Sequence, residues 1–186
     1  MKKTLALLLG SALSLCAADV TVATLYDSQL RIAEGEIVSL AKAVPESAYK
    51  FAPTGGAFEK VRTFGGQVKH LATVLYMASA AAQQEKPPVE LGNGENGPVT
   101  VKTKAEIVQY LQDAFTYAHK AMGSMTAANQ LDMVKSPFGS GEMARGGIAS
   151  LTVWHSFDHY GQMVVYARMN NVVPPASMPP PAAKKK

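Results

Sequence analysis

The chain has 186 residues, of which 47% are hydrophobic and 17% are charged, and its formal net charge is +4. This length fits one domain with tails rather than two independent cores, and the hydrophobic fraction excludes a globally disordered chain. Five of the 18 basic residues lie at the extreme ends (Lys2, Lys3 and 184–186), so the body carries 13 basic residues against 14 acidic ones. A nearly neutral body gives no basic face for nucleic acid.

Residues 1–18 are predicted to be a secretory signal peptide. Two lysines precede an uncharged Leu/Ala-rich run over 4–15, which is too short to span a membrane, and small residues then offer a cleavage point. A lipoprotein signal is the alternative, because Leu13-Ser14-Leu15-Cys16 resembles a lipobox. The leucine before the cysteine is larger than such boxes accept. We therefore expect the protein from Asp19 onward to be periplasmic or secreted.

Cys16 is the only cysteine, and it lies within the predicted signal peptide. The mature chain would then contain no disulfide, no thiolate metal site and no cysteine nucleophile. An exported fold without disulfides must depend on its hydrophobic core.

Apolar residues that recur every three to four positions predict four helices. Pro45 ends the first, and Thr103 with Glu106 forms a capping box at the start of the third. The expected helices cover 23–44, 58–82, 103 to about 122, and 142–170.

The connection over 83–102 is rich in Gly, Pro and Asn, and an extended chain of that length can span a bundle. The second and third helices are therefore expected to lie parallel, and the only strand expected is a short pairing at 99–101. The predicted fold is an all-α four-helix bundle over 19–173, with a long crossover between helices two and three. Residues 174–186, rich in Pro and Lys, are predicted to be disordered or polyproline-like.

Three histidines are the candidate chemical groups. His155 and His159 are four residues apart on the apolar stripe of the fourth helix, so their imidazoles share one face. Buried imidazoles need partners for their nitrogens, and one metal ion would satisfy both rings. His70, beside the apolar stripe of the second helix, could complete a three-histidine site, although a packed or surface histidine is the alternative. His119 lies off the buried stripe of the third helix and is expected at the solvent edge.

The spacing of this histidine pair is also that of metalloprotease helices. Such motifs place a glutamate after the first histidine as the general base, whereas this chain has Ser156. A peptidase of that kind is therefore disfavoured.

Several segments, taken together, resemble the DinB-like (DinB/YfiT-like) family of metalloenzymes. They span most of the chain from residue 23 to residue 175. The segments are Val44-Pro45-Glu46 with Tyr49-Lys50-Phe51-Ala52-Pro53, then Thr63-Phe64-Gly65-Gly66-Gln67-Val68-Lys69-His70, then His155-Ser156-Phe157-Asp158-His159-Tyr160-Gly161-Gln162, and finally Tyr166 to Pro175.

The resemblance implies a four-helix bundle whose metal ion is held by His70, His155 and His159. Nickel or zinc is the usual metal of such sites, although imidazole ligands also suit copper and iron. Some relatives are transferases or isomerases that use low-molecular-weight thiols, which an exported protein would seldom meet. Gly66 departs from the family pattern, which often has an acidic residue there. This departure concerns the tuning of the site and not the ligands.

Three protein ligands leave a coordination position open for water or substrate, as in catalytic zinc sites. One hypothesis is therefore a metal-dependent hydrolase or thiol transferase acting on a small molecule, and a homodimer is compatible with such a bundle. The other is a non-catalytic metal-binding or interaction module of the cell envelope, with its basic tail on anionic surfaces. The third hypothesis is a bundle whose histidines only pack and bind no metal.

Gln67, Asp158 and Tyr160 neighbour the ligands in sequence, but Asp158 is rotated off the histidine face.

Overall fold

The computed structural model describes residues 20–179, so the predicted signal peptide and Cys16 lie outside the described residues. Four helices account for most of this part of the chain, with one hairpin and two short 3-10 turns. In chain order the elements are α1 (Val22–Ala43), η1 (Glu46–Lys50), α2 (Phe64–Gln83), α3 (Lys104–Gly123), β1 (Met133–Lys135), β2 (Glu142–Ala144), α4 (Arg145–Met169) and η2 (Pro175–Ser177).

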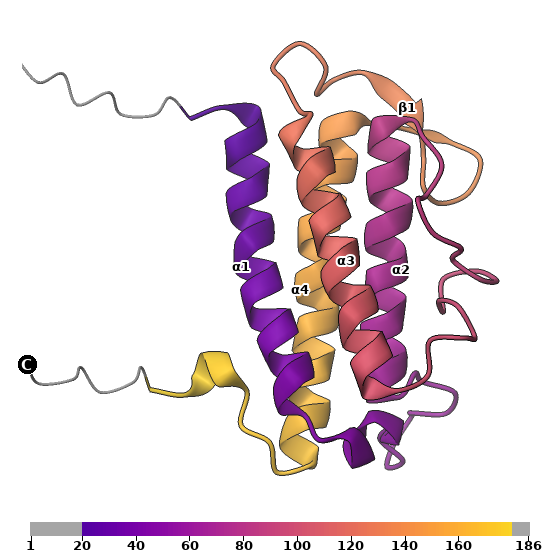
Figure 1. Cartoon of the computed structure of the whole chain (residues 1–186), viewed down its shortest axis with the longest axis vertical. Helices are drawn as coiled ribbons and strands as arrows, with labels where there is room; N and C mark the ends of the chain where they lie inside the picture. The colour runs from indigo at the N-terminus through magenta and orange to yellow at the C-terminus, as the bar shows by residue number, and fades with distance from the viewer. Residues whose placement is uncertain (1–19, 180–186) are drawn as a thin grey trace, which may run out of the picture.

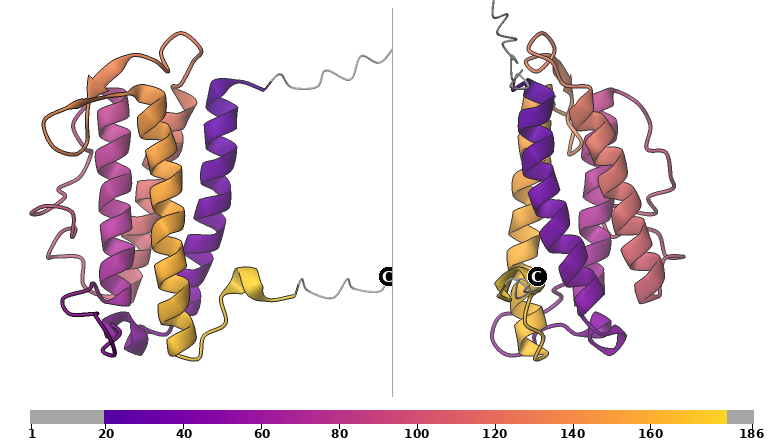
Figure 2. Two further views of the ribbon diagram at one scale, coloured as in Figure 1. Left: turned by 180° about the vertical axis from the view of Figure 1, so that it is seen from behind. Right: turned by 60° about the vertical axis from the view of Figure 1, so that its left-hand side comes forward.

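The four helices form a bundle, as predicted (Figure 1). α2 and α3 run in the same direction, antiparallel to α1 and α4, and the chain between α2 and α3 returns along the length of the bundle (Figures 1 and 2). The Gly- and Pro-rich segment between Gln83 and Lys104 is thus the crossover that the sequence predicts. None of the helices in residues 20–179 is both long and apolar enough to cross a membrane.

The core lies between the apolar stripes of the helices. α1 packs against α3 and α4, and α2 packs against the same two helices, so the centre of the bundle excludes water. The largest fully buried side chains come from all four helices: Leu30, Ile37, Leu40, Phe64, Leu71, Leu75, Leu111, Phe115, Met122, Ile148 and Met163.

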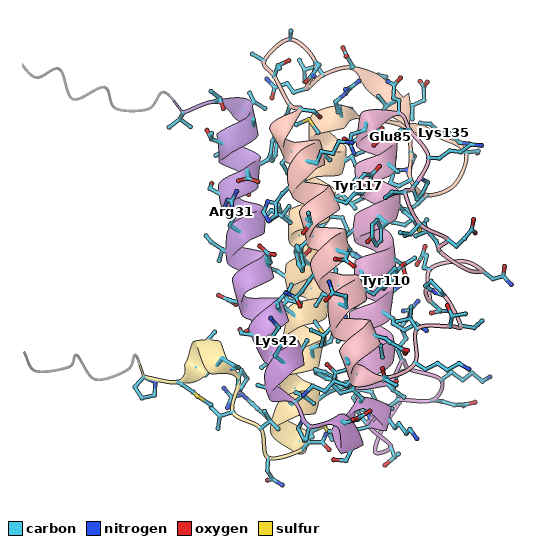
Figure 3. The ribbon with its side chains drawn as sticks, viewed as in Figure 1. Arg31, Lys42, Glu85, Tyr110, Tyr117 and Lys135 are labelled. Carbon is cyan, nitrogen blue, oxygen red and sulfur yellow. The ribbon has the colours of Figure 1, made fainter. Side chains whose placement is uncertain are left out.

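A polar contact joins α3 to the end of α2. The Tyr117 hydroxyl donates to the Glu85 carboxylate over 2.8 Å, and both side chains lie toward the end of the bundle that carries the hairpin (Figure 3). Burial, together with the neighbouring Glu85 charge, raises the pKa of Tyr117, so this phenol stays a hydrogen-bond donor at neutral pH.

The helix ends follow local capping chemistry. The capping box at Thr103 is present, because the Thr103 side chain accepts from the Glu106 N–H while the Glu106 carboxylate accepts from the Thr103 N–H. The prediction that the second helix begins at residue 58 was wrong. It begins at Phe64, because the Thr63 side chain caps it and Lys60 just before has a φ of 63°, which is incompatible with a helix.

The predicted strand position was also wrong. Residues 99–101 form part of a turn in which the Val101 N–H donates to the Pro98 carbonyl. The strands are instead β1 and β2, which pair antiparallel with Val134 opposite Met143. This pairing moves the start of the fourth helix from the expected residue 142 to Arg145.

The chain after α4 begins with an ordered turn. Pro174 is buried, and η2 follows it, with the Ser177 hydroxyl accepting from the Arg168 guanidinium over 3.0 Å. The Pro/Lys-rich segment expected from residue 174 therefore starts against the bundle, and its residues 180–186 lie outside the described part.

Candidate metal centre

His70, His155 and His159 come together between α2 and α4. One nitrogen from each ring can be chosen so that all three lie within 4.8 Å of one another, close enough to hold one metal ion. The ring centroids are 5.4 Å apart for His70 and His155, 4.6 Å for His70 and His159, and 4.5 Å for His155 and His159. Among residues 20–179 this is the one group of three His, Cys, Asp or Glu side chains with such proximity.

The two helices place these rings for simple geometric reasons. His155 and His159 are one turn apart on α4, on the face that packs against α2, and α2 presents His70 to the same space. His70 and His159 are almost fully buried, at 3% and 6% exposed, and His155 is partly buried. The imidazoles therefore sit in the interior of the bundle and not on its surface.

Hydrogen bonds fix the orientation of two of the rings. The Nδ1 atom of His70 lies 2.8 Å from the Glu95 carbonyl oxygen, and Nδ1 of His159 lies 2.7 Å from Oε1 of Gln67. Both partners are acceptors, so each Nδ1 carries the proton and each Nε2 keeps a lone pair. This is the pattern that protein partners impose on metal-binding histidines.

A row of polar side chains extends from His159 to the surface. The Gln67 amide donates to the Gln162 carbonyl oxygen over 2.9 Å, and the Gln162 amide donates to the Asp158 carboxylate over 3.3 Å. A carboxylate only accepts, so Asp158 determines which way both amides point and thereby presents a carbonyl oxygen to His159. Asp158 is exposed and off the histidine face, as predicted, yet hydrogen bonds through two glutamines connect it to His159.

His155 has a buried Nε2 atom that makes no hydrogen bond within the described chain. Leaving a polar nitrogen buried without a partner costs about 1–3 kcal/mol. A metal ion bound by the lone pairs of the three rings would supply the missing partner. The donor set therefore fits a divalent transition metal.

The protein environment keeps the three histidines neutral. Burial lowers the pKa of His70, His155 and His159, and for His159 the fall from 6.5 is to about 3. The positive charge that a neighbouring ring would carry adds to this effect for His155 and His159, and the Arg62 guanidinium lowers the pKa of all three. Neutral imidazole is the form that binds a metal ion.

The crossover contributes a partner that sequence reasoning missed. Glu95 accepts from His70 through its backbone carbonyl, which any residue type could supply, so no sequence signal marks it. The segment is held against α2 because Lys69 donates to the Pro98 and Val101 carbonyl oxygens. Gly97, with a φ of 75°, permits this approach, since a Cβ there would lie 2.9 Å from Oγ1 of Thr73.

The departure at Gly66 has a local explanation. A side chain at this position would meet the Thr63 hydroxyl at 3.2 Å and the Arg62 side chain, and would not face the histidines. Gly66 is the third residue of α2, where an acidic side chain would complete a capping box with Thr63. The glycine therefore affects the capping of the start of α2 more than the geometry of the histidine centre.

The other two candidate residues lie outside the centre. His119 links α3 to α1, with Nδ1 bonded to the Asp27 carboxylate and Nε2 lying 3.1 Å from the Glu34 carboxylate. Tyr160 also faces α1, where burial and then the Glu36 carboxylate raise its pKa. His119 is thus partly exposed, as predicted, and it does not line the histidine cluster.

The Gln67 contact gives a testable expectation. Replacing Gln67 with Leu removes the acceptor of the His159 Nδ1–H, and we expect the affinity for zinc or nickel to fall about 10- to 100-fold. The measurement is a competition titration with a chromophoric chelator. Gln109→Leu, on the exposed face of α3, is the matched control and should bind like the wild type. Equal affinity in the two variants would contradict this role of Gln67.

Comparison with known proteins agrees with this fold. The similar solved structures include a DinB-like protein from Bacillus cereus (TM-score 0.64, 14% identity, covering 81% of this chain and 93% of that one) and one from Bacillus subtilis (TM-score 0.61, 13% identity, 79% and 92%). No curated protein matches the chain. The family model described as the DinB superfamily matches residues 29–163, which include all three histidines and most of the bundle. This chain belongs to the DinB superfamily.

Proposed function

We propose that this protein is an exported metal-dependent enzyme in which His70, His155 and His159 bind one divalent transition metal ion. The single observation that carries the proposal is the buried Nε2 of His155, which has no hydrogen-bond partner among residues 20–179 and lies beside two imidazoles whose tautomers leave their Nε2 lone pairs free. Three neutral nitrogen ligands suit zinc or nickel, which we propose as the native metals.

The chain's own groups would hold the ion rigidly. Glu95 and Gln67 fix the rings of His70 and His159, and the packing of α2 against α4 brings the two helices' ligands together. When bound, an ion held by three protein ligands would supply Lewis acidity, which can lower the pKa of a water molecule or a substrate thiol. Hydrolysis and thiol transfer are the reaction classes that we propose for the centre.

Export is proposed from the sequence pattern of residues 1–18. The positive start, the short apolar run and the small residues before Asp19 support a cleaved signal peptide. The absence of cysteine after position 16 is compatible with an oxidising compartment, where a free thiol is a liability.

A second candidate, a non-catalytic metal site of the cell envelope, is favoured by one observation. His70 and His159 are only 3% and 6% exposed, and a closed site that serves stability alone would be buried in this way. The two functions differ in whether a small molecule can reach the ion.

Cobalt substitution tests this difference. Cobalt(II) bound to the mature protein should give visible absorption bands, and adding azide or 2-mercaptoethanol should shift them if a coordination position is open. The matched control is the His119→Ala variant, which leaves the centre intact and should respond like the wild type. Cobalt bands that no added ligand shifts would overturn catalysis and favour the closed site.

A further inference from the structure

A cavity of about 660 Å³ lies beside the histidine centre. It shares a wall with the centre, because Gln67 and Gln162, the pair that orients His159, both line it. The rest of the lining comes from the loop before α2, from the crossover and from the end of α4: Phe58, Lys60, Val61, Arg62, Asn96, Val165 and Tyr166.

The charge of this cavity has one sign. Of the residues that the structure describes, two basic ones line it and no acidic one does. The Lys60 side chain is 87% exposed, and its ammonium lies in solvent 3.4 Å from the Glu59 carboxylate, so it adds little charge to the interior of the cavity. Arg62 is partly buried, and no carboxylate among residues 20–179 pairs with it. The cavity therefore contains one partly buried cation without a protein counter-ion.

The Arg62 guanidinium is held in place from one side. Its Nε donates to Oδ1 of Asn96 over 2.9 Å, and Asn96 directly follows Glu95, whose carbonyl oxygen orients His70. One loop thus positions both a ligand histidine and this arginine. Because Asn96 occupies Nε, the two Nη groups remain to bind an anion, and that fork matches a carboxylate in both geometry and charge.

We propose that this cavity is a substrate subsite that binds a small organic monocarboxylate with an apolar body. The carboxylate would pair with Arg62, and the apolar part would lie against Phe58, Val61 and Tyr166. A single unpaired cation favours one carboxylate over a doubly charged phosphate, and the cavity volume suits a small molecule rather than a polymer. Its role as a substrate subsite rests on the proposed function, whereas carboxylate binding itself does not require the metal.

The test uses the protein after removal of metal by chelation, with benzoate, phenylacetate and hexanoate as probes. Binding is followed by protein NMR titration up to about 10 mM, the range for weak fragment binding. We expect at least one probe to bind, its neutral amide analogue to bind about 10-fold more weakly or not at all, and Arg62→Gln to lose about 10- to 100-fold in affinity. Arg31→Gln, an exposed arginine on α1 (Figure 3), is the matched control and should bind like the wild type.

Three outcomes would overturn the subsite. They are the absence of binding by all the carboxylates, equal binding of acid and amide, and equal binding by the wild type and Arg62→Gln. The acid–amide comparison uses the wild-type protein, so it stands even if Arg62→Gln fails to fold. Carboxylate binding that appears only after metal is restored, and that survives in Arg62→Gln, would place the anion on the ion; it would overturn this inference while leaving the metal centre supported.

Discussion

The purified protein without its predicted signal peptide, residues 19–186, is expected to bind about one zinc or nickel ion per chain, and the variant His70→Ala, His155→Ala, His159→Ala close to none. The reason is the convergence of three neutral imidazole nitrogens within 4.8 Å of one another, with the Nε2 of His155 buried and without a hydrogen-bond partner in the described part of the chain. Three nitrogen ligands on one ion are the protein contribution to many zinc sites. Elemental analysis after dialysis against each metal, with protein quantified independently, measures the ratio.

His119→Ala is the matched control for this experiment. It also removes an imidazole, but one bonded to Asp27 and Glu34 between α3 and α1. We expect it to keep the full metal content. Metal retained in the triple variant, or absent from the wild type after incubation with both ions, would contradict the metal centre and leave three packed histidines.

The metal-free protein is expected to lose stability steeply as the pH falls below about 6.5. In the unfolded chain His159 takes up a proton near its ordinary pKa of 6.5, whereas the folded protein keeps it neutral until about pH 3. The unfolded state therefore binds more protons between these values. Stability is at its full value above 6.5 and decreases by up to about 1.4 kcal/mol per pH unit for this one group as the pH falls toward 3.

Urea unfolding of the wild type and of His159→Leu between pH 7 and pH 4.5 measures this effect. The leucine variant lacks the titrating ring, so its free energy of unfolding should decrease less as the pH is lowered. Burial also lowers the pKa values of His70 and His155, so these two rings account for part of the slope that remains. Saturating zinc should raise the wild-type free energy of unfolding without flattening its slope, since the metal binds the neutral rings of the folded state and leaves proton uptake by the unfolded chain unchanged. Parallel curves for wild type and variant would contradict a neutral, buried His159.

Local sequence signals predicted most of the architecture. The three-to-four spacing of apolar residues places α1 and α3 to within a residue or two, because a helix must bury one stripe whatever its neighbours are. The capping box at Thr103 and Glu106 needs only residues three apart. The long crossover and the parallel pair of helices follow from a connection too long to be a turn.

The two misjudged helix boundaries have different causes, strand pairing before α4 and local backbone conformation before α2. β1 and β2 are three residues each, and their pairing depends on contacts that no periodicity within such short segments can reveal. α2 begins at Phe64 because of one threonine cap and one left-handed residue, although the apolar pattern continues before it.

For the candidate site, the sequence by itself determined that His155 and His159 share one helical face and that His70 lies on the face of another helix. The distance between those faces was decided by the packing of α2 on α4, since residues 85 or more apart in the chain meet only in three dimensions. The same holds for the groups that orient the rings. A backbone carbonyl from the crossover accepts from His70, and the first of two linked glutamines accepts from His159. An arginine from the loop before α2 lines the neighbouring cavity. These contacts depend on where the backbone lies and not on residue type alone, and therefore only the tertiary structure could decide them.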